Sequence, residues 1–76
     1  MKVGRLFFDN SDKPFSQKVL ECADKFEVRA GHRPNTCEVN ELTTGAANVD
    51  KAGDIVIKRK LGIIVNHFWI GNEDEE

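Results

Sequence analysis

Only one stretch of this 76-residue chain has the spacing of an amphipathic helix, and this limits the folds open to the chain. From Phe15 to Ala30, apolar residues recur three or four positions apart and form one stripe. Pro14 is typical of a helix start, and Gly31 followed by Pro34 is typical of a helix end. Because one helix can shelter only one face of a sheet, a second face must meet water or another molecule.

Strand-like patterns occupy most of the remaining chain, at residues 2–8, 36–39, 54–59 and 67–71. The polar, glycine-punctuated segment 40–53 is predicted to be mostly loop. Residues 60–66 fit either a turn at Gly62 followed by more strand or an extended connection.

These elements predict an α+β fold in the order β-α-β-β-β. We expect a small single domain over residues 1–72, with one long helix packed on one face of a three- to four-stranded mixed sheet. The last two strands are expected to pair antiparallel.

The stretch GHRPNTC at residues 31–37 gathers histidine, arginine and cysteine at the end of the helical pattern. Arg29, His32 and Arg33 place positive charge near the negative end of the helix dipole, which favours a structural interpretation of this stretch over a site.

The charge and hydropathy of the chain predict a soluble cytoplasmic protein. No apolar run approaches the length of a membrane span, and the first residues lack the pattern of an export signal. Residues 73–76 form an acidic tail that we expect to be disordered, whereas the rest of the chain is close to neutral. Cys22 and Cys37 are accordingly expected to be reduced thiols.

Alternation along the strands predicts which side chains share a face of the sheet. One set is expected to pack under the helix as the core: Leu6, Phe8, Cys37, Val39, Ile55, Ile57, Phe68 and Ile70. The opposite face is expected to carry Val3, Arg5, Phe7, Glu38, Val56, Lys58, His67 and Trp69. A slip of one residue in any strand would exchange its two sets.

The two aromatic residues expected on the opposite face, Phe7 and Trp69, call for a covering. Segment 40–53, a second copy of the chain, or a ligand could supply it. Because small domains have thin cores, we favour a binding or assembly module that forms a homodimer through this face. The interface candidates are Phe7, Trp69, Val56, Arg5, Lys58 and His67.

Single-stranded nucleic acid is the alternative partner for the same face. Trp69, Phe7 and His67 could stack on bases, while Arg5 and Lys58 could pair with phosphates. The acidic tail, which begins shortly after Trp69, counts against this alternative.

Catalytic and metal-binding patterns are weak. Two cysteines and two histidines match a zinc ligand count, but their spacing does not match a zinc motif. Asp9 and Asp12 follow the first strand and could hold magnesium for a hydrolase, although a turn and a helix start explain them equally well. We therefore predict no catalytic residues and no cofactor.

Two segments carry a resemblance to known proteins. RPNTCEVN at 33–40 and NHFWIG at 66–71 resemble segments of short, uncharacterised bacterial proteins that end in an HFWIG-type strand. The arrangement is more loosely similar to helix-then-sheet segments of tailed-phage capsid subunits. The first resemblance implies no activity, and the second concerns architecture alone.

Overall fold

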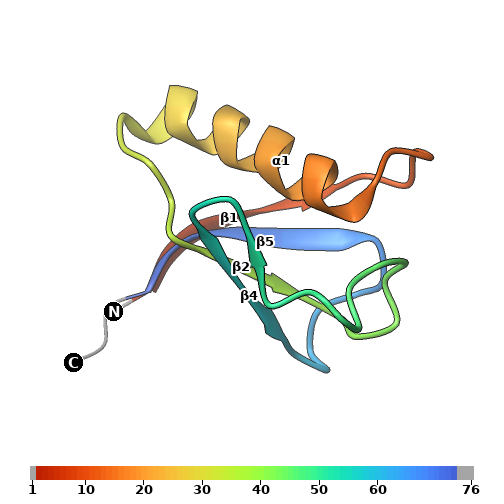
Figure 1. The fold of residues 1–76 in the computed structure, drawn as a ribbon. Coiled ribbons are helices and arrows are strands. Elements are labelled where there is room, and N and C mark those ends of the chain that lie inside the picture. Colours follow the sequence, from red (N-terminus) through yellow and green to blue (C-terminus); the bar gives the residue numbers. More distant parts are fainter. Residues whose placement is uncertain (1, 74–76) are drawn as a thin grey trace.

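The computed structural model of the chain describes residues 2–73. One helix lies across one face of a five-stranded mixed sheet, as predicted for an α+β domain (Figure 1). The elements in chain order are β1 (Lys2–Phe8), α1 (Phe15–Ala30), β2 (Thr36–Val39), β3 (Lys51–Ala52), β4 (Ile55–Arg59) and β5 (His67–Glu73).

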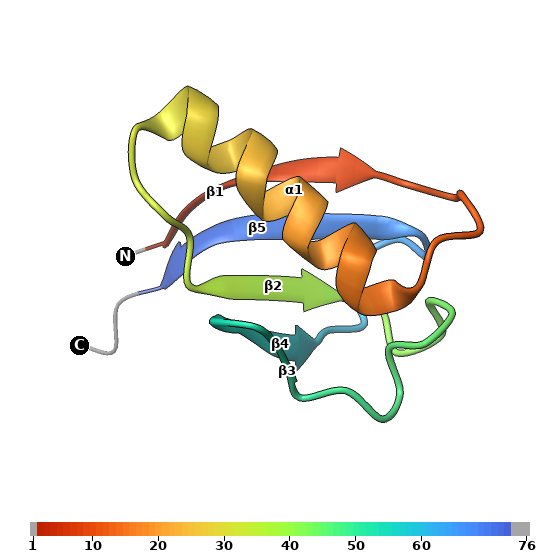
Figure 2. The same cartoon turned by 45° about the horizontal axis from the view of Figure 1, so that its top comes forward.

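The strands follow the order β1-β5-β2-β4-β3 across the sheet (Figure 2). The last strand, β5, lies between β1 and β2 and pairs antiparallel with both, while β2 and β4 pair parallel. The prediction that the last two strands pair with each other is therefore wrong. Chain order does not reveal this insertion, because every strand offers the same backbone hydrogen-bonding groups to a neighbour.

One strand that the sequence did not predict lies within the segment expected to be a loop. The short strand β3 lies within the predicted 40–53 loop, and a turn at Gly53 and Asp54 joins it to β4. The sheet therefore has one strand more than the upper limit predicted. Residues 60–66 contain no strand, so they form the connection between β4 and β5.

The ends of α1 are those that the sequence predicts. Pro14 occupies the position before the first helical residue, and no side chain caps this end. Gly31 adopts a left-handed conformation with φ of 84°, and its N–H donates to the Glu27 carbonyl at 2.9 Å. This is the usual glycine termination of a helix.

The core lies between α1 and the sheet. Its buried apolar residues from α1, β2, β4 and β5 agree with the predictions for these elements: Phe15, Val19, Cys22, Ala23, Phe26, Cys37, Val39, Ile55, Ile57, Phe68 and Ile70. Ala52 of β3 is a further buried residue, which the sequence did not predict. Lys18 is also buried, at 4% exposure, on the margin of the helix stripe. Helical spacing alone does not predict a buried lysine there.

The loop between β2 and β3 closes the core beside the first turn of α1. Thr43 and Ala46 are buried, and Val49 packs against the core cluster. A side chain at Gly45 would overlap the Phe15 Cβ atom, which shows how closely this loop approaches the helix. The loop therefore packs against the helix side of the sheet.

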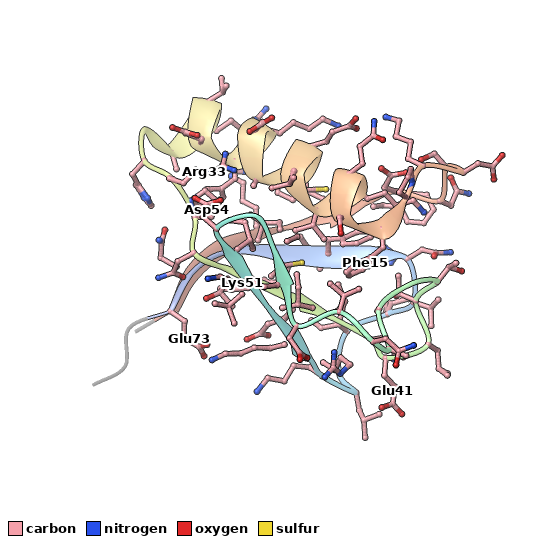
Figure 3. The ribbon with its side chains drawn as sticks, viewed as in Figure 1. Phe15, Arg33, Glu41, Lys51, Asp54 and Glu73 are labelled. Atoms are coloured by element: carbon pink, nitrogen blue, oxygen red, sulfur yellow. The ribbon has the colours of Figure 1, made fainter. Side chains whose placement is uncertain are left out.

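Arg33 joins the end of α1 to the turn between β3 and β4. Its Nη1 atom lies 2.8 Å from Asp24 Oδ1 and 3.2 Å from Glu27 Oε1. Its Nε atom lies 3.3 Å from Asp54 Oδ2, and Figure 3 shows Arg33 and Asp54 side by side. Arg33, which the sequence assigned to the helix dipole, thus links two elements.

Two further predictions concern the acidic tail and the membrane. Glu73, the first residue of the predicted acidic tail, is the last residue of β5 and pairs with Lys2. The remainder of that predicted tail, 74–76, lies outside the described residues. Within residues 2–73, no helix has the length and apolar character needed to cross a membrane.

Candidate functional site

The sheet face opposite α1, which we call the outer face, carries four of the predicted interface candidates. Cross-strand register places His67 and Trp69 there, because Phe68 and Ile70 between and beside them are fully buried under α1. Val56 and Lys58 alternate in the same way with the buried Ile57. These four residues lie on the face predicted for them.

The prediction for the first strand is wrong in its parity. Phe7 pairs with the buried Phe68 and packs against the core, so it lies on the helix side. Arg5 pairs with Ile70 and lies on the helix side as well. The outer face instead receives Leu6 and Phe8, at 54% and 60% exposure.

The run Leu6–Phe7–Phe8 explains why the sequence did not reveal this parity. Three consecutive apolar side chains fit either face equally well, so alternation alone cannot orient the strand. The register with β5 orients it, because directly paired residues share a face.

The Trp69 indole lies across the outer face above β1. A Cβ atom at Gly4 would overlap the indole ring and would lie 2.6 Å from the Ile70 carbonyl oxygen. Gly4 therefore provides the space in which the indole rests on the sheet. Trp69 is half-buried.

Two of the charged side chains of the outer face neutralise each other. Lys58 forms an ion pair with Glu73. Glu38 lies opposite Lys58 in one neighbouring strand and Trp69 in the other, and it is only 4% exposed. A carboxylate so well covered is normally held by a partner, which reduces the net charge of this half of the face.

The apolar half of the face lies over β1 and β5. We define the outer apolar patch as Leu6, Phe8 and Trp69, which come together because Leu6 pairs directly with Trp69. The Phe8 and His67 rings lie 5.0 Å apart at the end of the patch. Two exposed residues, Ile64 and Val65, come just before His67 in the chain. A contiguous apolar surface of this kind is typical of an interaction site.

The candidate carboxylates Asp9 and Asp12 lie near a separate polar cavity of about 270 Å³. Asp9 Oδ1 accepts a hydrogen bond from the Ser11 N–H at 2.9 Å, and hydrogen bonds from Ser11 hold the pKa of Asp9 below its usual value. Asp12 and the buried Lys18 both line the cavity. An ammonium group there opposes the binding of a second cation.

Metal ligands do not gather elsewhere in the described chain. Across residues 2–73, no three or more histidine, cysteine, aspartate or glutamate side chains are close enough together to hold an ion. Cys22 and Cys37 are buried free thiols. Burial raises the pKa of Cys22 to about 11 and raises that of Cys37 further, so both thiols are protonated at neutral pH.

Comparisons with protein-family models, with curated proteins and with solved structures found no match to this chain.

Proposed function

We propose that this protein is a small assembly module that forms a homodimer through the outer apolar patch. The observation that carries the proposal is the exposure of Leu6 and Phe8 beside the Trp69 indole, on the face that α1 does not cover. Burying such side chains between two copies would remove apolar surface from water, at about 25 cal/mol per Å².

The charge distribution supports a second copy as the occupant. Lys58 is paired with Glu73, and Arg5 lies on the other side of the sheet. Two outer faces can therefore approach each other without strong repulsion between like charges. An interface between identical copies requires this self-complementarity, because the same patch serves both sides.

Single-stranded nucleic acid stays the alternative. The outer face offers Phe8, His67 and Trp69 as rings for stacking, but its lysine next to them is engaged by a carboxylate. Binding to nucleic acid draws most of its affinity from phosphate contacts, so this face favours a protein partner.

The oligomeric state tests the proposal. We expect sedimentation velocity at micromolar concentrations to show a dimer for the native chain and a monomer for Phe8→Lys. Phe8 is more than half exposed, so the substitution removes an interface contact while the fold is retained. Circular dichroism checks that the variant is folded.

The matched control is Val28→Lys, which places the same charge on the exposed side of α1, where Val28 is 85% exposed. This variant should remain dimeric. A native chain that stays monomeric at tens of micromolar, or a Val28→Lys variant that dissociates as readily as Phe8→Lys, would contradict the proposal. A fluorescence titration with a single-stranded oligonucleotide at low salt tests the alternative.

A further inference from the structure

A second cavity lies on the helix side of the sheet, away from the outer face. It has a volume of about 500 Å³ and lies between β1 and the C-terminal end of α1. Its lining residues are Gly4, Arg5, Phe26, Arg29, Ala30 and His32. The volume is in the range of small-molecule sites in proteins.

The cavity combines positive charge with an apolar wall. Arg5 from β1 and Arg29 from α1 both line it, and none of its lining residues is acidic. Phe26 is buried, and the His32 ring stands edge-on to it with centroids 5.6 Å apart. His32 is thereby positioned by a core residue.

Arg5 and Arg29 differ from the other two arginines, Arg33 and Arg59, in their contacts with carboxylates. Arg33 contacts three carboxylates and Arg59 contacts Asp50, whereas no carboxylate of residues 2–73 lies within ion-pair distance of Arg5 or Arg29. Arginine side chains that have no carboxylate partner remain available to an anion from solution.

Charge is also segregated around the end of α1. Asp24 and Glu27 point to the side of the helix where Arg33 holds them beside Asp54. Arg29 lies on the β1 side, where it lines the cavity with Arg5. The carboxylates of this end are thus engaged elsewhere, so Arg5 and Arg29 are the charged side chains that line the cavity beside the negative end of the α1 dipole.

We propose that this cavity binds a small organic phosphate monoester. Two guanidinium groups match the charge of a phosphate dianion, and each can donate two parallel hydrogen bonds to its oxygens. A carboxylate carries one negative charge and therefore balances only one of the two cations. The cavity, at about 500 Å³, is larger than a phosphate ion, so it has room for an organic group attached to the phosphate.

The probe for this site is phenyl phosphate, which joins a dianion to an apolar ring. We expect NMR titration of the full chain at low salt to move the amide signals of Arg5, Arg29 and His32, with a dissociation constant of about 1 mM or lower. Inorganic phosphate should bind more weakly, because it lacks the ring. Benzoate should also bind more weakly, because it carries one charge.

The variants Arg5→Gln and Arg29→Gln should each weaken binding about tenfold, which corresponds to the loss of one charge-assisted interaction. Arg5→Lys should lie between these variants and the native chain, because lysine keeps the charge without the planar fork. Lys60→Gln, which removes an exposed cation outside the cavity, should bind phenyl phosphate like the native chain. All four substitutions are at exposed positions.

Three results would overturn the proposal. The first is no signal movement up to about 20 mM phenyl phosphate, a concentration well above the expected dissociation constant. The second is equal affinity of Arg5→Gln, Arg29→Gln and the native chain. The third is an oligonucleotide that binds equally with and without a 5′ phosphate, since that would identify a phosphodiester as the recognised group. None of these results depends on dimer formation, because the cavity lies on the helix side of the sheet and Phe8 lies on the outer face.

Discussion

At the scale of single residues, Gly4 determines how the only tryptophan of the chain rests on the sheet. Replacing Gly4 with alanine should displace the Trp69 indole, because a Cβ atom would overlap the ring. We expect a loss of about 1–3 kcal/mol in the free energy of unfolding, as for other substitutions that overfill a packed site. Denaturant unfolding followed by Trp69 fluorescence measures both effects.

Gly62→Ala is the matched control for this prediction. A Cβ atom at Gly62 would meet nothing within 4 Å, so this variant should keep the native fluorescence spectrum and stability. Equal stability of Gly4→Ala and the native chain would show that the indole does not rest on β1.

The two cysteines give a second prediction at this scale. Burial raises the pKa of Cys22 to about 11, so little thiolate forms at pH 7 to 8, and reaction with a thiol reagent should be slow in the folded protein. Both thiols should react rapidly once denaturant unfolds the chain. A Val28→Cys variant should gain one fast thiol at an exposed site. Rapid modification of two thiols in the native protein would contradict the burial described here.

At the scale of elements, Arg33 connects α1 to the turn between β3 and β4. Replacing it with methionine should lower the melting temperature at pH 7, because three carboxylates lose their common partner. Arg29→Met is the matched control, since Arg29 contacts no carboxylate within residues 2–73 and its loss should change the melting temperature less. Equal effects of the two substitutions would show that the Arg33 contacts do not stabilise the fold.

The same contacts predict a pH dependence. Hydrogen bonds from Arg33 hold the pKa of Asp54 below its usual value. A carboxylate with a lowered pKa in the folded state stabilises the protein above its unfolded pKa of about 4, and this contribution is lost as the pH falls through the folded value. The difference in melting temperature between the native chain and Arg33→Met should therefore shrink below about pH 4. Thermal unfolding from pH 7 to 2 measures it.

At the scale of the whole molecule, dimer formation would connect stability to concentration. If two copies associate through the outer apolar patch, the melting temperature should rise with protein concentration, because association is coupled to folding by mass action. Phe8→Lys should remove this dependence, and Val28→Lys should keep it. Scanning calorimetry over a hundredfold range of concentration distinguishes these outcomes. A melting temperature independent of concentration in the native chain would contradict the dimer.

The predictions are correct where local spacing decides the structure and wrong where the position of β5 decides it. The helix, its glycine termination and the buried residues of β2, β4 and β5 follow from local spacing, which the sequence displays directly. The faces of β1 do not follow, because they depend on the pairing with β5, whose residues lie 59 or more positions further along the chain than their partners in β1. A test based on the sequence alone would have substituted Phe7, which packs against the core, whereas Phe8 is the surface residue.

Local periodicity is enough to predict that one helix covers one sheet face and that Trp69 lies on the other, because helical and strand periods are local properties of the chain. The pairing of β5 with β1 is visible in the folded chain and not in its local patterns. That pairing sets the register, and the register turns Leu6 and Phe8 outward and Arg5 toward the helix side. The patch and the basic cavity both result from this one long-range contact, since hydrogen bonds between distant strands carry no local sequence signal.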